Sequence, residues 1–199
     1  MLALSALLVI SGAVRSVVLQ GEVPIKRNQP PASVAVIMVD GLAESKGCSG
    51  GILYTGHFVV SVHSTTGNRD TDLNALLGAD TLSFPEHPYW HTWPIQFADF
   101  NQDGQPDFSI APHFCGNNGQ YSLLTIASDG SVSRIAVVPD GSLWISDGVP
   151  SSSSIKIVPD GIQIGAYDNS TGSGVTRRYR WEPARHAFVL VPATPAVGK

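Results

Sequence analysis

Charged residues are scarce in this sequence of 199 residues, of which they make up 14%, against about 25% in an average globular protein. Basic residues form no cluster larger than Arg177-Arg178, and the net charge is −4. Nucleic-acid binding needs a basic patch or stripe that neutralises phosphates. The sequence therefore predicts no nucleic-acid partner.

The apolar stretch at residues 2–10 is too short to cross a bilayer, which takes about 20 residues. Its length suits the hydrophobic region of a signal peptide, and Ser11-Gly12-Ala13 offers a small-residue cleavage site. No basic residue precedes the stretch, so a buried strand is the alternative. We expect a signal peptide at residues 1–13 and a periplasmic or secreted protein with no membrane span.

Cysteine is limited to Cys48 and Cys115. In an exported protein they could form a disulfide, which would stabilise the fold by roughly 4 kcal/mol in the chain-entropy model. Two unrelated buried thiols are the alternative, and the sequence leaves both open. The glycine-rich phosphate loop and the dinucleotide-binding fingerprint are both missing from the sequence.

Turn-forming residues are abundant, with 20 Gly and 14 Pro. Asp-Gly pairs such as Asp129-Gly130 and Asp147-Gly148 separate apolar segments, a strong signal for β-hairpins. One short helix is expected at 70–79, capped by Asp70 or Thr71. The expected strands are 15–20, 34–40, 58–62, 108–111, 121–127, 131–138, 142–146, 162–167, 175–181 and 188–191. We predict one all-β, hairpin-rich domain at 14–192, propeller-like or sandwich-like, and a loose tail at 193–199.

One loop gathers the oxygen side chains that calcium prefers. Its first, third, fifth, seventh and ninth positions are Asp99, Asn101, Asp103, Gln105 and Asp107. A calcium ion takes six to eight oxygen ligands, and a glycine at the sixth position, here Gly104, permits the sharp turn. Position twelve is Ile110, not the Glu of an EF-hand, so the loop leads into a strand.

A solvated Asp/Asn/Gly turn is the alternative to a calcium loop. The three carboxylates within this short segment repel one another unless a cation lies between them, and the amide of Asn101 lies among them. We therefore expect Ca²⁺ as a bound ion, with Gln105 contributing its backbone carbonyl. A Kd of about 0.1 mM and an external concentration of about 1 mM would give roughly 1.4 kcal/mol of stabilisation.

Catalytic patterns are weak. The segment Gly47–Leu53 followed by His63 is similar to part of a trypsin-like protease, but no Gly-Asp-Ser-Gly-Gly follows it. A metal hydrolase using His87, His91 and His113 is the second alternative, and Pro88 disfavours the helix that would align the first two histidines. We expect a protein that is not an enzyme.

A glycine- and asparagine-rich segment at 113–120 follows the strand after the calcium loop and ends at Tyr121. Its backbone could approach a partner closely, and Tyr121 could anchor the contact. A hairpin loop with Tyr121 in the core is the alternative. The four tryptophans, Trp90, Trp93, Trp144 and Trp181, serve either as core residues or as sugar-binding surfaces.

The loop and the strand after it resemble FG-GAP/VCBS repeats, whose pattern is D-x-N-x-D-G-x-x-D followed by an apolar strand. Residues 98–110 fit this pattern. Residues 95–140 and the ending from Tyr179 to Leu190 also resemble periplasmic I-type lysozyme inhibitors. Some proteins of that kind act as immunity proteins against hydrolases delivered by Xanthomonas-type type IV secretion.

That resemblance implies a loop that enters the cleft of a peptidoglycan hydrolase. The implied contact residues are Asn117, Asn118, Gly119 and Tyr121, where the family's Ser-Gly-x-x-Tyr pattern is not reproduced. The sequence thus leads to an exported, calcium-binding inhibitor or immunity protein whose partner is a lysozyme-like hydrolase. The alternative is a calcium-dependent adhesion or carbohydrate-binding module of the FG-GAP/VCBS type.

Overall fold

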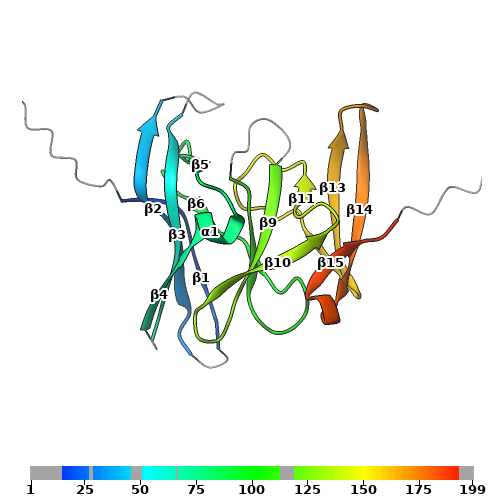
Figure 1. Ribbon diagram of the computed structural model, residues 1–199, viewed down its shortest axis with the longest axis horizontal. Helices are drawn as coiled ribbons and strands as arrows, with labels where there is room; N and C mark the ends of the chain where they lie inside the picture. Colours follow the sequence, from blue (N-terminus) through cyan, green and yellow to red (C-terminus); the bar gives the residue numbers. More distant parts are fainter. Residues whose placement is uncertain (1–14, 27–28, 46–50, 66, 113–118, 193–199) are drawn as a thin grey trace, which may run out of the picture.

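The computed structural model describes residues 15–26, 29–45, 51–65, 67–112 and 119–192. Within these ranges strands dominate, with one α-helix and one 3₁₀ turn (Figure 1). The elements are β1 (Ser16–Val23), β2 (Ala32–Glu44), β3 (Leu53–Ser64), β4 (Gly67–Asp72), α1 (Leu73–Leu77), β5 (Leu82–Pro85), β6 (Trp93–Pro94), β7 (Phe97–Ala98), β8 (Asp107–Ile110), β9 (Gly119–Ile126), β10 (Val132–Val138), β11 (Leu143–Ile145), β12 (Lys156–Val158), β13 (Gly161–Asp168), β14 (Ser173–Glu182), η1 (Pro183–Arg185) and β15 (Ala187–Leu190).

The N-terminal part forms a six-stranded sheet in the order β4-β3-β2-β1-β6, with β5 also paired to β3. β2 and β3 are the long strands of this sheet and pair in antiparallel fashion from Ser33–His63 to Glu44–Leu53. A bulge lies between Met38 and Asp40. Irregularities of this kind bend a strand and increase its twist.

The remaining strands form a nine-stranded sheet in the order β12-β13-β14-β15-β10-β9-β8-β7, with β11 also paired to β9. The last strand, β15, lies between β14 and β10 and runs parallel to β10, where Ala187 pairs with Ala136. β15 thereby connects the β14–β15 hairpin at the C-terminal end to β10, which comes from the middle of the chain. One of the two sheets curls into a half-barrel.

β9 lies between two hydrophobic cores and is buried on both faces, in the centre of Figure 1. Leu124 and Ile126 face the core shared with the six-stranded sheet, whereas Tyr121 and Leu123 face the core inside the nine-stranded sheet. Successive side chains of a strand point to opposite faces. A strand that is covered on both faces therefore needs apolar residues at odd and at even positions, and β9 has them.

The predicted all-β, hairpin-rich fold is confirmed. The predicted helix at 70–79 is too long, because Gly67–Asp72 pairs with β3 and α1 begins only after Asp72. The carboxylate of Asp72 accepts the Ala75 N–H at 3.0 Å and caps the helix. The expected signal peptide, the tail at 193–199, Cys48 and Cys115 lie outside the described residues. No helix in the described part of the chain is long and apolar enough to span a membrane.

Candidate functional site

The predicted calcium loop connects β7 to β8, and its backbone N–H groups donate to its own acidic side chains. The Asp99 carboxylate accepts from Asp103 N at 3.0 Å and from Gly104 N at 2.9 Å. The Asp103 carboxylate accepts from Gln105 N at 2.8 Å. Gly104 has φ +85°, a conformation that side chains rarely adopt. The carboxylates of Asp99 and Asp103 are thus held within one tight turn.

Asp107 lies at the closed end of this loop, as the first residue of β8, and is completely buried. Its Oδ2 accepts the Phe100 N–H at 2.8 Å, while Oδ1 makes no hydrogen bond of normal geometry to the described residues, although the nearby Thr125 hydroxyl acts to lower the pKa of this carboxyl. The hydroxyl of its cross-strand neighbour Thr125 is also buried without a hydrogen bond of normal geometry. Burial raises the pKa of Asp107 to about 7, with a smaller contribution in the same direction from Asp103. The negative charge of such a buried carboxylate must be compensated by a bound cation or removed by protonation.

Asn101 and Gln105 belong to the same loop. Asn101 is buried, its Oδ1 accepts from Asp103 N at 3.1 Å, and its amide donates to Asp103 Oδ2 at 2.9 Å. Within the described ranges, no three His, Cys, Asp or Glu side chains are grouped as a preformed metal site. Carboxylate, amide and carbonyl oxygens are nevertheless the ligands that calcium takes. The residues of the loop therefore fit calcium by their chemistry.

Tyr121 is in the core and not on the surface, which corrects its expected role as an exposed anchor. It is fully buried, and its hydroxyl lies within hydrogen-bond reach of the carbonyl oxygens of Asp147 and Val149. Gly119 lies beneath the Tyr121 ring, where a Cβ would come within 2.6 Å of Cε2. The other two predicted contact residues, Asn117 and Asn118, are outside the described residues.

An exposed tryptophan lies beside the position where the anchor was expected. Trp144 on β11 pairs with Gln120 on β9, and its side chain is 45% exposed. It borders a hollow of about 390 Å³ that also includes Pro112, Arg134 and Asp140. The alternation of Trp144 with the buried Leu143 and Ile145 would have revealed its outward orientation from the sequence.

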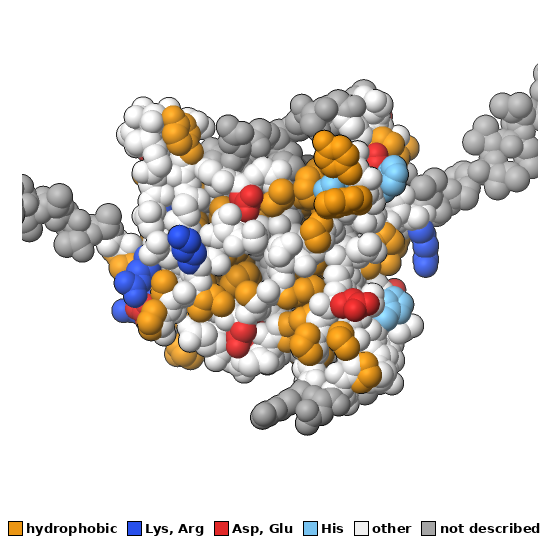
Figure 2. Space-filling view, turned by 180° about the vertical axis from the view of Figure 1, so that it is seen from behind, with side chains coloured by type: hydrophobic (Ala, Val, Ile, Leu, Met, Phe, Trp, Pro, Cys, Tyr) orange, Lys and Arg blue, Asp and Glu red, His pale blue; other side chains and the backbone are white. Residues whose placement is uncertain are grey.

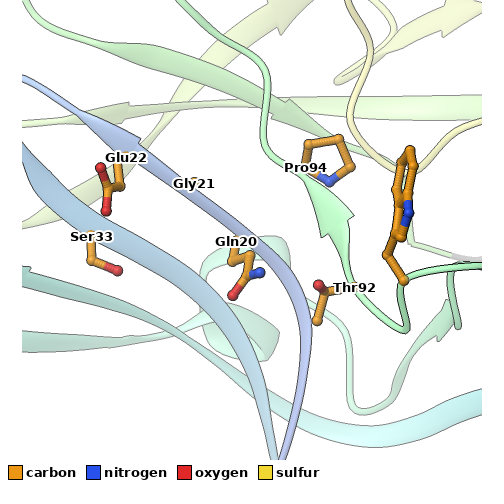
Figure 3. Close-up of a pocket in the computed structure, with 7 residues that line it drawn as sticks. Gln20, Gly21, Glu22, Ser33, Thr92 and Pro94 are labelled. Atoms are coloured by element: carbon orange, nitrogen blue, oxygen red, sulfur yellow. The ribbon is translucent and has the colours of Figure 1, made fainter.

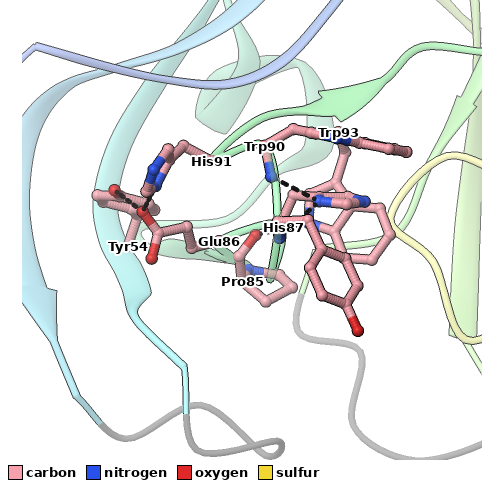
Figure 4. A network of polar contacts seen from close by, with 8 residues as sticks. Tyr54, Pro85, Glu86, His87, Trp90, His91 and Trp93 are labelled. Carbon is pink, nitrogen blue, oxygen red and sulfur yellow. Dashed lines mark hydrogen bonds and ion pairs between the residues drawn. The ribbon is translucent and has the colours of Figure 1, made fainter.

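A second candidate site is the aromatic segment between β5 and β6, whose histidines and tryptophans the sequence offered without showing how they pack. Figure 2 shows hydrophobic side chains gathered next to histidines on one face of the molecule, and Tyr89 and Trp90 are 81% and 69% exposed. The His87 ring is buried and stacks on Trp90, with ring centres 4.4 Å apart and planes within 12°. Its Nδ1 accepts from the N–H groups of Tyr89 and Trp90, both at 3.1 Å (Figure 4).

The two histidines of this segment do not face a common ligand. His91 contacts Glu86 at 2.7 Å, and Glu86 also accepts from the Tyr54 hydroxyl at 3.3 Å. His87, in contrast, directs Nδ1 to the backbone and packs its ring between indoles. Each histidine thus has a separate structural contact, and the third histidine of the hydrolase alternative, His113, lies outside the described residues.

Ser61, His63 and Asp70 form the arrangement that most resembles a catalytic triad. The Ser61 hydroxyl donates to Asp70 Oδ1 at 2.6 Å and contacts His63 Nε2 at 2.8 Å. In a Ser-His-Asp triad the histidine lies between the other two and takes the serine proton. Here the serine lies in the middle and gives its proton to the carboxylate, so the order of the relay is not reproduced.

Comparisons with protein-family models, curated proteins and solved structures find no match to this chain. The features of this chain that bear on function are therefore the loop between β7 and β8 and the exposed tryptophans Trp90 and Trp144.

Proposed function

We propose that this protein is a non-enzymatic, calcium-loaded β domain that binds and blocks a lysozyme-like peptidoglycan hydrolase in the periplasm or outside the cell. One observation carries the calcium part. The buried Asp107 carboxylate leaves Oδ1 without a hydrogen bond of normal geometry to the described residues, at the closed end of an oxygen-rich loop. A bound cation would compensate this buried charge and the repulsion from Asp103.

In this proposal calcium has a structural role. Asp99, Asn101, Asp103 and Asp107 would supply side-chain oxygens and Gln105 its carbonyl. Asp107 pairs with Thr125 on β9, so fixing its carboxylate also fixes β8 against β9. The ion would thereby stabilise β9, whose first residues lie next to the proposed contact surface around Trp144.

The partner class rests on the resemblance of residues 95–140 to lysozyme inhibitors. The described surface at that place offers Pro112, Gln120 and Trp144 around a hollow. Tryptophan is enriched at the energetic centres of protein interfaces because it buries a large, rigid apolar area. Trp144 thus replaces Tyr121 as the aromatic anchor, and Tyr121 supports the start of β9 from inside.

The test is inhibition of a panel of lysozyme-like hydrolases by the full chain, with calcium and with EDTA. We expect one hydrolase to be inhibited in calcium, and we expect EDTA to weaken that inhibition. Trp144→Ala should raise the inhibitor concentration needed by at least tenfold, because a central interface tryptophan commonly contributes about 2 kcal/mol or more.

The matched control is Trp90→Ala, which removes a more exposed tryptophan from a different surface and should leave inhibition unchanged. Calcium titration by calorimetry gives an independent reading of the ion, and Asp107→Asn should weaken it. An absence of inhibition across the panel would refute the inhibitor function, and an absence of calcium binding would refute the metal site.

A further inference from the structure

A second hollow, of about 520 Å³, lies along β1 and beside the aromatic segment before β6 (Figure 3). Its size is within the range of small-ligand sites, about 300–1,000 Å³. It is lined by Gln20, Gly21, Glu22, Ser33, Trp90, Thr92 and Pro94. None of these residues borders the hollow next to Trp144, so the two surfaces are distinct.

The Trp90 ring is exposed and yet firmly supported. One of its faces is covered by the buried imidazole of His87, which also packs edge-on against Trp93 at 4.4 Å. The Trp93 indole is fixed in turn, since its Nε1 donates to the Pro85 carbonyl at 2.9 Å. An aromatic ring that is already ordered loses little conformational entropy when a ligand packs on it.

The described residues on the opposite side of the hollow are polar, and none of them carries a positive charge. Its side chains offer an amide at Gln20, a carboxylate at Glu22 and hydroxyls at Ser33 and Thr92. No hydrogen bond from these four side chains to another residue is found within the described part of the chain. Hydrogen-bond donors and hydrogen-bond acceptors are therefore both available to a ligand.

We propose that this hollow binds a neutral oligosaccharide. A sugar ring has a flat face of C–H groups and a rim of hydroxyls, and the site presents an apolar ring surface next to uncharged and carboxylate hydrogen-bonding groups. Trp90 packs against the face of one sugar ring, and Gln20, Glu22 and Thr92 hydrogen-bond the hydroxyl rim. The described lining residues include no Lys or Arg, which disfavours phosphates and other anions.

This site is independent of the proposed hydrolase inhibition and can be tested separately. The test is calorimetric titration of the calcium-loaded full chain with cellohexaose, chitohexaose and maltohexaose, together with co-sedimentation on insoluble cellulose, chitin and peptidoglycan. The soluble and insoluble ligands distinguish a free oligosaccharide from a polymer of the same chemistry. We expect at least one of them to bind, with a change in tryptophan fluorescence.

Trp90→Ala should weaken that binding at least tenfold, and Trp90→Phe should weaken it less because a smaller aromatic surface remains. Trp144→Ala is the matched control and should bind like the unaltered protein. Gln20→Ala, at an exposed position on β1, supplies a variant that leaves the aromatic segment intact and should also weaken binding. The proposal is overturned if the unaltered protein binds none of these ligands, or if Trp90→Ala binds with unchanged affinity.

Discussion

Asp107 has two structural roles. It is the first residue of β8 and pairs with Thr125 on β9, and its side chain closes the loop that precedes β8. Its Oδ2 accepts the Phe100 N–H, and its buried Oδ1 makes no hydrogen bond of normal geometry within the described part of the chain. The pKa of this carboxyl is raised from 3.8 to about 7, chiefly by burial. If the loop binds calcium as proposed, the protonation state of this single residue would link calcium occupancy to the stability of the fold.

The sign of this linkage gives a prediction for the calcium-free protein. Since the pKa of Asp107 is higher in the folded state, the folded state holds more protons between pH 3.8 and about 7. The free energy of unfolding in EDTA should therefore fall as the pH rises through this window, by an amount on the order of a few kcal/mol. Urea denaturation at a series of pH values measures it.

Asp107→Asn is the control for that measurement, because an amide of the same shape does not titrate. The variant should lack the part of the slope that Asp107 contributes. Saturating calcium should also reduce the slope, because a bound ion keeps the carboxylate ionised. Identical slopes for the two proteins in EDTA would show that Asp107 titrates normally.

At the residue scale, the turn from Asp99 to Asp107 was predictable from the sequence, whereas its binding of calcium stays a prediction and the burial of Tyr121 was not foreseen. The turn could be predicted because the spacing of Asp99 to Asp107 is a local signal. The burial of Tyr121 depends on Asp147 and Val149, which are far along the chain. The surface formed by Trp90 likewise requires packing on His87 and Trp93, which residue spacing alone does not specify.

At the scale of elements, the close approach of β2 and β3 depends on glycine at their bend. A Cβ on Gly56 would lie 2.1 Å from the Asp40 carbonyl oxygen and 2.6 Å from Gly41 Cα. Both contacts are with backbone atoms of the partner strand, which cannot move without breaking the pairing. The bend next to the bulge at Met38 therefore excludes any larger residue at this position.

Gly56→Ala should accordingly lower the free energy of unfolding by about 3 kcal/mol, as expected for overpacking against a rigid neighbour. Gly165→Ala is the matched control on β13, where a Cβ would meet nothing within 4 Å. It should change stability by less than about 0.5 kcal/mol. Chemical denaturation of both variants measures the difference, and equal stability would show that β2 and β3 can separate at this point.

The hairpin at Asp129-Gly130 was predictable because its signal is local. The turn at Asp129-Gly130 joins β9 to β10, and Gly130 N donates to the Ala127 carbonyl at 2.8 Å. The expected hairpin at Asp147-Gly148 is wrong, because β11 before it pairs with β9 and β12 after it pairs with β13. The length of the helix was overestimated, because pairing of Gly67–Asp72 with β3 prevails over local helix propensity. Tertiary contacts of this kind leave no periodic pattern in the segment itself.

At the scale of the whole molecule, the all-β class followed from composition and turns, but the sheet order did not. The parallel pairing of β15 with β10 joins Ala187 to Ala136 across a long stretch of chain. Parallel neighbours of this kind need a long connection and have no short-range signal. The sequence therefore indicated the C-terminal strand without indicating its partner.

The position of β9 between the two cores has a consequence for how the molecule opens. Neither core can lose its packing without uncovering one face of this strand, and the strand contributes Leu124 to one core and Leu123 to the other. The two halves should therefore unfold together in one transition. In native-state hydrogen–deuterium exchange, the β9 amides should exchange only through global unfolding, whereas those of the β4 edge strand should exchange far sooner.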